Sequence, residues 1–139
     1  MEATTLTVEC IVNAPVQRVW SCWTQPEHIT QWNNASEDWY TPKAENDLRA
    51  GGRFLSRMEA RDGSFGFDFT GVYTEVQVHQ LIAYSLEDGR KVQVRFEDLG
   101  NTTRITEIFD PEQENSAEMQ RTGWQAILNN FKRYTESMG

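Results

Sequence analysis

The stretch that decides the fold runs from Asn13 to Gly52 and reads NAPVQRVWSCWTQPEHITQWNNASEDWYTPKAENDLRAGG. After Pro15, which suits the first turn of a helix, apolar residues recur at helical spacing up to Trp23. Thr24 can cap a second short helix that begins near Pro26. The Gly51-Gly52 pair then leads into a strand. The stretch therefore predicts two short helices placed between two strands.

Alternating apolar and polar residues predict strands on both sides of this stretch. Before it, Thr5–Val12 alternates in this way, as a strand with one covered face does. After it, Asp62-Gly63 is a hairpin signal between a strand at Arg53–Ala60 and a returning strand that begins near Phe65. Further strands are predicted at Leu81–Leu86, Lys91–Glu97 and Thr102–Phe109. Together they indicate an antiparallel meander.

A long helix is predicted at the C-terminal end, with Ser116 as its N-cap. Met119, Gly123, Ile127, Phe131 and Tyr134 repeat every three or four residues, and Trp124 and Leu128 widen this apolar stripe. Gln120 is expected to face water. We expect the helix to cross the concave face of the sheet.

Gly123 and the segment Asn33–Pro42 do not fit a simple pattern of helices and strands. Gly123 costs the helix about 1 kcal/mol relative to alanine, which close approach to the sheet or space for a ligand would explain. Asn33–Pro42 is interpreted as a loop whose Trp39 and Tyr40 fold back over an apolar edge.

Composition and charge exclude several classes of partner. The chain has 139 residues, which fits one domain over residues 1–139, and a formal net charge of −8, which argues against binding to nucleic acid. No apolar segment is long enough to insert into a membrane, so a cytoplasmic protein is expected. Cys10 and Cys22 are interpreted as buried thiols. A monomer and a homodimer both remain open.

A series of short motifs runs along nearly the whole chain. The first are Asn13-Ala14-Pro15 with Val19-Trp20, Trp23-Thr24 with Pro26-Glu27-His28 and Trp32, and Asp47-Leu48-Arg49 with Gly51-Gly52. The series continues through Phe69–Tyr73, Leu81–Tyr84, Thr103–Thr106 and Gly123-Trp124. In these motifs and their order the chain resembles the bacterial homologues of the activators of heat-shock-protein ATPases (AHSA-like proteins), a branch of the START-like, or SRPBCC, helix-grip superfamily.

The resemblance implies an α+β helix-grip fold, in which a curved antiparallel sheet of about six or seven strands wraps around a long C-terminal helix. It also implies a cavity between sheet and helix that is closed at one end by the two short helices. The chain departs from the family at Trp32-Asn33-Asn34-Ala35, where relatives often have a Trp pair and Gly-Pro. It also lacks the additional N-terminal domain of the eukaryotic co-chaperones, which argues against chaperone activation.

Strand parity and helical spacing select the residues expected to line this cavity and bind a ligand. They are Trp32, Trp39, Phe54, Ser56, Met58, Phe67, Phe69, Tyr73, Tyr84, Phe96, Glu107, Trp124, Ile127 and Leu128, with Val94 and Ile105 on the same face. Glu107 shares parity with Ile105, which places its carboxyl group on the inward face of the strand. Burial there tends to raise the pKa of a carboxyl group. Three alternatives remain open. An error in the predicted register or a bulge would turn Glu107 away from the interior, and an arginine near the rim would pair with its carboxylate.

The sequence contains no nucleophile elbow, phosphate-binding loop, dinucleotide motif or metal-ligand cluster, so neither a cofactor nor a metal is expected. The leading hypothesis is therefore a non-enzymatic domain that binds a small hydrophobic ligand, either lipid-like or aromatic. One alternative is a cyclase or hydrolase that uses Glu107 and a tyrosine for proton transfer. Another is a stress-related, co-chaperone-like interaction module that uses exposed Trp39 and Tyr40, or the edge strand, as its binding surface.

Overall fold

The computed structural model describes residues 5–34 and 36–138, which form three helices and one seven-stranded antiparallel sheet. In chain order the elements are β1 (Leu6–Val12), α1 (Val16–Thr24), α2 (Pro26–Trp32), β2 (Trp39–Asn46), β3 (Arg53–Ala60), β4 (Gly66–Gln77), β5 (Leu81–Leu86), β6 (Lys91–Asp98), β7 (Thr103–Phe109) and α3 (Ala117–Ser137). The predicted α+β helix-grip fold is confirmed.

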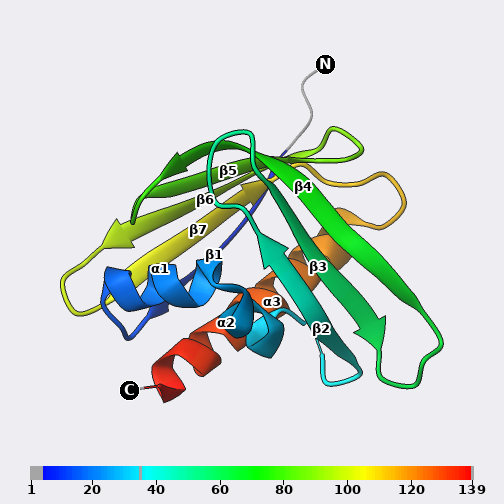
Figure 1. Cartoon of the computed structure of the whole chain (residues 1–139), viewed down its shortest axis with the longest axis horizontal. Coiled ribbons are helices and arrows are strands. Elements are labelled where there is room, and N and C mark those ends of the chain that lie inside the picture. Colours follow the sequence, from blue (N-terminus) through cyan, green and yellow to red (C-terminus); the bar gives the residue numbers. More distant parts are fainter. Residues whose placement is uncertain (1–4, 35, 139) are drawn as a thin grey trace.

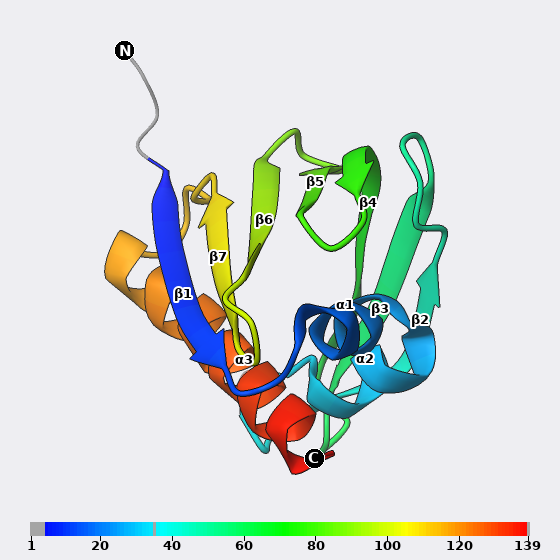
Figure 2. The same ribbon diagram turned by 90° about the vertical axis from the view of Figure 1, so that its left-hand side faces the viewer.

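The sheet curls around the long helix. Its strand order is β1-β7-β6-β5-β4-β3-β2, so β2 to β7 form a meander and β1 pairs with the last strand of that meander. In Figure 1 the sheet lies over α3, with α1 and α2 at one end. Figure 2 looks into the curl, where β1 and β2 form opposite edges and α3 runs from beside β1 towards the two short helices.

Side-chain alternation sets which face of each strand is buried. In β7, Thr103, Ile105, Glu107 and Phe109 are buried, while the residues between them are partly exposed. β1 pairs with this strand without a register shift, from Leu6 opposite Phe109 to Val12 opposite Thr103. Glu107 therefore points inward, as its parity predicted, and neither a bulge nor a register error intervenes.

The prediction of a loop over Asn33–Pro42 is wrong in its second half, because β2 begins at Trp39. Pro42 lacks a backbone N–H, and proline is normally confined to edge strands and bulges. β2 is the edge strand of the sheet, and its register with β3 shifts between Tyr40 and Lys43. Pro42 thus lies on an edge strand and at a register shift, the two places where a sheet accepts proline. Because proline normally argues against a strand, this strand was not predicted.

The helix α3 packs against β1 and the inner face of the sheet. The hydroxyl of Ser116 accepts a hydrogen bond from the Met119 amide at 3.1 Å, so the predicted N-cap is confirmed. Met119 itself is exposed, contrary to prediction. Gln120 is buried instead, and its side-chain amide donates to the carbonyls of Glu112 and Asn115. The first turn of the helix thus packs on the preceding loop through a polar side chain.

Aromatic rings join the short helices to α3. The ring of Phe131 lies 4.8 Å from the rings of both Trp23 and Trp32, measured between centroids, and those two indoles are 5.0 Å apart. The indole N–H of Trp32 donates to the carbonyl of Cys22 at 2.8 Å. The predicted N-cap at Thr24 is wrong: Gln25 occupies that position, and the Thr24 hydroxyl donates back to the Trp20 carbonyl.

Two glycines on the concave side behave differently. A β-carbon at Gly71 would lie 2.7 Å from the ring of Phe54, so glycine is what allows that ring to lie flat over β4. A β-carbon at Gly123 would meet no atom within 4 Å. Close approach to the sheet therefore does not explain Gly123. The other explanation, space for a ligand, stays a prediction, because Gly123 does not line the cavity.

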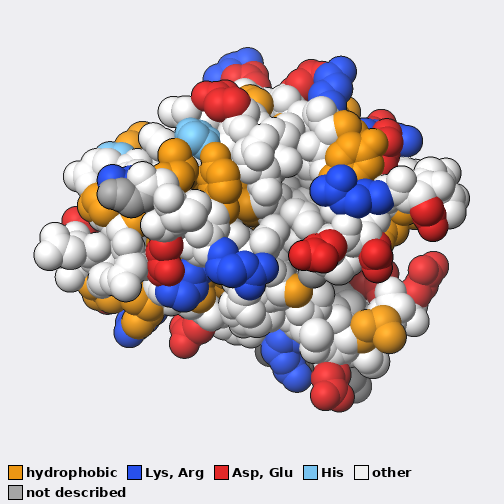
Figure 3. Space-filling view, turned by 90° about the horizontal axis from the view of Figure 1, so that it is seen from below, with side chains coloured by type: hydrophobic (Ala, Val, Ile, Leu, Met, Phe, Trp, Pro, Cys, Tyr) orange, Lys and Arg blue, Asp and Glu red, His pale blue; other side chains and the backbone are white. Residues whose placement is uncertain are grey.

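The described residues contain no helix that is both long and apolar enough to cross a bilayer. On the face shown in Figure 3, basic side chains lie scattered among acidic ones, and the described lysines and arginines visible there form no continuous patch.

Candidate functional site

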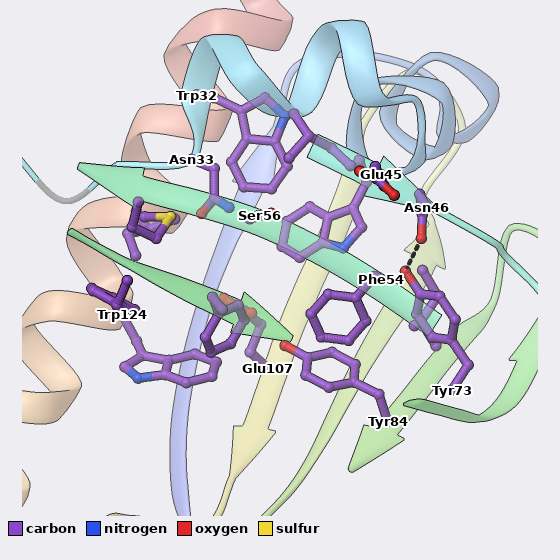
Figure 4. Close-up of a pocket in the computed structure, with 17 residues that line it drawn as sticks. Trp32, Asn33, Glu45, Asn46, Phe54, Ser56, Tyr73, Tyr84, Glu107 and Trp124 are labelled. Carbon is purple, nitrogen blue, oxygen red and sulfur yellow. Dashed lines mark hydrogen bonds between the residues drawn. The ribbon is translucent and has the colours of Figure 1, made fainter. Parts of the chain in front are cut away.

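A cavity of about 240 Å³ lies between α3, α2 and the inner face of the sheet. Figure 4 shows its walls, to which every strand from β2 to β5 contributes, together with β7. Phe67 and Glu45 keep exposed side chains and mark the side that opens to solvent. The lining residues are Trp23, Ile29, Trp32, Asn33, Glu45, Asn46, Phe54, Ser56, Met58, Phe67, Phe69, Tyr73, Ile82, Tyr84, Glu107, Trp124 and Ile127.

Most residues selected from the sequence lie on this wall. They are Trp32, Phe54, Ser56, Met58, Phe67, Phe69, Tyr73, Tyr84, Glu107, Trp124 and Ile127. Alternation in β3, β4, β5 and β7 and helical spacing in α3 selected all of them except Trp32, which lies on α2. Their role in binding a ligand stays a prediction.

Three selected residues lie elsewhere, each for a local reason. Trp39 is on the edge strand, and its ring packs on Phe65 and Phe67 at the end of the β3–β4 hairpin. Phe96 is buried behind the wall, in edge-to-face contact with Trp20 and Trp23. Leu128 is fully buried in the core, because one residue along a helix turns the side chain by about 100° away from the direction of Ile127.

The concave face is thus filled on one side and hollow on the other. Val94 and Ile105, on β6 and β7, are fully buried in the same solid core as Leu128. The cavity lies instead mainly over β3, β4 and β5, while α3 packs on β1 and stacks Trp124 on Phe109 of β7. Strand parity separates inside from outside, but it does not tell which half of the interior is filled.

Six wall residues were not selected from the sequence. Glu45 and Asn46 were missed because their strand, β2, was not recognised. Ile82 has the same parity as Tyr84 on β5, a signal that was present in the sequence. Trp23, Ile29 and Asn33 come from α1, from α2 and from the end of α2, and helical spacing alone does not tell which side of so short a helix faces the sheet.

Part of the polar lining is already hydrogen-bonded. The Tyr73 hydroxyl donates to the side-chain oxygen of Asn46, and the Asn46 amide donates to the backbone carbonyl of Thr24 at 2.6 Å. This chain of bonds joins β4, β2 and α1. Tyr73 and Asn46 therefore serve first to hold the short helices over the end of the cavity.

Glu107 and Tyr84 are different, because within the described residues their polar atoms are neither hydrogen-bonded to the protein nor closed off from the cavity. Glu107 is only 5 % exposed. Burial raises its pKa to about 8, so the carboxyl group is mostly protonated at neutral pH. Burial, and secondarily the charge of Glu107, also raise the pKa of Tyr84. Two neutral polar groups thus face an otherwise largely aromatic space.

Stability should fall as the pH rises through the range in which Glu107 ionises. Its carboxyl group has an ordinary pKa of 4.5 and a folded-state pKa of about 8, so between these values the native state holds a proton that the unfolded chain has lost. The loss of stability across this window is on the order of 4 kcal/mol. Glu107→Gln should remove it.

Urea denaturation at pH 5 and pH 8.5 checks this prediction. The variant should match the wild type at pH 5 and exceed its free energy of unfolding at pH 8.5, since the difference between the two proteins isolates Glu107 from all other titrations. Parallel pH profiles for the two proteins would show that Glu107 is already ionised in the native state.

The geometry gives little support to the cyclase or hydrolase alternative. Proton transfer requires Glu107 to be hydrogen-bonded to a tyrosine, but the Tyr73 hydroxyl is bound to Asn46, and no hydrogen bond joins Tyr84 to Glu107 in the described part of the chain. Both histidines lie away from the cavity: His28 is 2.6 Å from the Tyr134 hydroxyl, and the ring of His79 packs edge-on against Trp20. The described residues hold no cluster of three or more potential metal ligands.

The interaction-module alternative rests on Trp39 and Tyr40. Trp39 and its two phenylalanine neighbours form a small, partly exposed aromatic cluster at the hairpin end. Tyr40 donates to Glu59 at 3.2 Å, and the Arg61 guanidinium lies over its ring. Both side chains thus have partners within the chain, and the adhesive role stays a prediction.

Comparison with known proteins gives one family and many similar structures. The profile of the family described as Activator of Hsp90 ATPase homolog 1-like protein matches residues 13–136. No curated protein matches the chain.

The solution structure of an AHSA1-like protein from Aeromonas hydrophila is 41% identical, covers 98% of this chain and 94% of its own, and has a TM-score of 0.92. A solution structure from Cytophaga hutchinsonii is 51% identical, with coverages of 96% and 93% and a TM-score of 0.83. A crystal structure from Nitrosomonas europaea, 19% identical with coverages of 97% and 96% and a TM-score of 0.84, shares the fold.

Proposed function

This chain belongs to the Activator of Hsp90 ATPase homolog 1-like family, and from that premise we propose that it binds a small, uncharged, largely aromatic molecule in the cavity between α3 and the sheet. The observation that carries the proposal is the unfilled volume among aromatic rings. The wall contains the rings of Trp23, Trp32, Phe54, Phe67, Phe69, Tyr73, Tyr84 and Trp124. Protein interiors normally pack without such voids.

The size of the cavity limits the ligand. An apolar cavity of about 150 Å³ holds benzene, which has six heavy atoms. By proportion, 240 Å³ accommodates roughly ten heavy atoms, which corresponds to a fused bicyclic compound. At about 0.7 kcal/mol per heavy atom, such a compound binds with a Kd on the order of 10 µM.

The charge of the wall limits the ligand further. Glu45 and Glu107 are the ionisable acids of the lining, which includes no lysine, arginine or histidine. A carboxylate or phosphate ligand would lose its hydration without gaining a positive partner, at a cost of several kcal/mol. Fatty acids and anionic lipids are therefore poor candidates, and uncharged aromatic compounds are good ones.

Binding of 2-ethylnaphthalene tests the proposal, because this fused bicyclic hydrocarbon requires no polar contact and is only about two heavy atoms larger than the estimate, in a cavity that is open on one side. At 50 µM it should stabilise the protein by about 1 kcal/mol, which raises Tm by about 3 °C. The same concentration of 2-naphthoate should have no effect. If neither the hydrocarbon nor compounds of the size of benzene or anthracene raise Tm saturably, the proposed function is wrong.

A further inference from the structure

We infer that Tyr84 and Glu107 form a two-donor site that holds the carbonyl oxygen of the ligand, so that the ligand is an aromatic ketone or a related carbonyl compound. This inference rests on the proposed function and specifies how the same cavity orients its guest. The inference adds a carbonyl group to the ligand, which the shape of the cavity alone does not require.

The two side chains come from strands that are not neighbours. Tyr84 lies on β5 and Glu107 on β7, with β6 between them, so the two strands are roughly 10 Å apart. The two residues are also offset by two positions along β6, which puts their backbones roughly 12 Å apart. On β6, Val92 is paired with Tyr84 and Val94 with Glu107. Because these two residues are short, the tyrosine and the glutamate can extend over them. In Figure 4 the Tyr84 hydroxyl points towards Glu107.

Buried polar groups almost always have hydrogen-bond partners, and the exceptions need an explanation. Glu107 is only 5 % exposed, Tyr84 is partly exposed, and both border the cavity. Among the described residues, the buried side-chain polar atom without a partner is Thr135 Oγ1, so the polar atoms of Glu107 and Tyr84 are open to the cavity, where a ligand can reach them. Neither arginine nor lysine lines the cavity to pair with the carboxyl group. A ligand that supplies the missing partner explains why both groups are kept in an aromatic cavity.

The chemistry of the pair favours a carbonyl oxygen. A protonated carboxyl group and a phenol each donate one hydrogen bond, and a carbonyl oxygen accepts two. A tyrosine and a neutral carboxylic acid in an apolar site hold a carbonyl-derived oxygen in this way in ketosteroid isomerase. A hydrocarbon would leave both donors unpaired, and a carboxylate would add a second negative charge whenever Glu107 ionises.

Ionisation of Glu107 should weaken binding of the ketone, since a carboxylate cannot donate. The other ionisable groups near it are Cys10 on β1, Tyr84 on β5, Tyr73 on β4 and Glu45 on β2, while α3 presents Trp124 and Ile127. Burial raises the pKa of Cys10 to about 12 and that of both tyrosines above the ordinary value, so these groups stay neutral around pH 8.

The experiment compares 2-acetylnaphthalene with 2-ethylnaphthalene by calorimetric titration at pH 6 and pH 9. At pH 6 the wild type should bind the ketone at least about 10-fold more tightly than the hydrocarbon. Tyr84→Phe and Glu107→Leu should each reduce this preference about fivefold or more. Glu107→Gln keeps a donor that does not titrate, so it should retain the preference at pH 6 and, unlike the wild type, at pH 9.

Tyr134→Phe is the matched control, because it removes a tyrosine hydroxyl that bonds to His28 outside the cavity and should leave the preference unchanged. The hydrocarbon affinity of each variant reports whether its cavity is intact. Equal affinity of the wild type for the two compounds, or a preference that survives in both Tyr84→Phe and Glu107→Leu, overturns the inference while leaving the proposed function in place. Failure of both compounds to bind, together with failure of compounds of the size of benzene and anthracene, overturns the proposed function itself.

Discussion

Replacing Ser56 with phenylalanine is expected to abolish binding of bicyclic ligands, with a loss of affinity of at least about 100-fold. Ser56 is buried on β3, between Phe54 and Met58 in the cavity wall, and pairs across the sheet with Phe69. Its side chain is the smallest on that wall. A phenyl ring occupies most of the roughly 150 Å³ that benzene fills, which leaves roughly 90 Å³ of a cavity of about 240 Å³.

The same substitution should not unfold the protein, since the new ring enters existing space rather than displacing packed atoms. Overpacking of a filled core would instead cost about 1–3 kcal/mol. Ser85→Phe is the matched control, because Ser85 alternates with the inward residues Tyr84 and Leu86 on β5 and does not line the cavity. A Ser56→Phe variant that is folded and still binds 2-ethylnaphthalene like the wild type would show that the ligand lies elsewhere. Ser56→Leu provides a smaller step if phenylalanine is not tolerated.

Replacing Phe131 with alanine is expected to lower the free energy of unfolding by about 3–5 kcal/mol. Phe131 is fully buried, and its ring contacts both Trp23 and Trp32, so it joins α3 to the two short helices. The substitution leaves a void at this junction. Because both indoles border the ligand cavity, affinity for 2-ethylnaphthalene should fall as well.

Chemical denaturation followed by tryptophan fluorescence measures this effect. Phe65→Ala is the matched control, because Phe65 is 60 % exposed and should cost less than about 0.5 kcal/mol. Equal losses in the two variants would mean that the aromatic junction contributes nothing special to stability.

The strands were predictable from sequence wherever one face is buried against the protein and the other is exposed to solvent. β7 shows this best, because Thr103, Ile105, Glu107 and Phe109 alternate with partly exposed residues, and this parity also placed the carboxyl group of Glu107 inside. The β3–β4 hairpin was predictable from Asp62-Gly63, since Gly63 adopts a φ of 78° and the Asp62 side chain accepts from the Ser64 amide. β2 was not predictable in the same way, because it is a polar edge strand that contains Pro42.

The cavity was predictable only in part, because its position depends on what lies opposite each inward residue. Phe54 and Phe96 have the same inward orientation on their strands, yet only Phe54 borders the cavity, since Phe96 is covered by Trp20 and Trp23. Ile127 and Leu128 are neighbours on one helix, and only the first reaches the hollow side. Such differences follow from which element packs over each residue, α1 over Phe96 and α3 beside the cavity, and periodicity does not encode this.

The most direct measurement is a titration of the protein with 2-ethylnaphthalene, followed by the indole N–H signals of its five tryptophans in ¹H–¹⁵N correlation spectra. Trp23, Trp32 and Trp124 border the cavity, whereas Trp20 and Trp39 do not. The signals of the first three should shift saturably with one common Kd, and the signal of Trp39 should stay in place. A saturable shift of Trp39 with the other three unmoved would contradict the central claim that α3 and the sheet enclose a ligand.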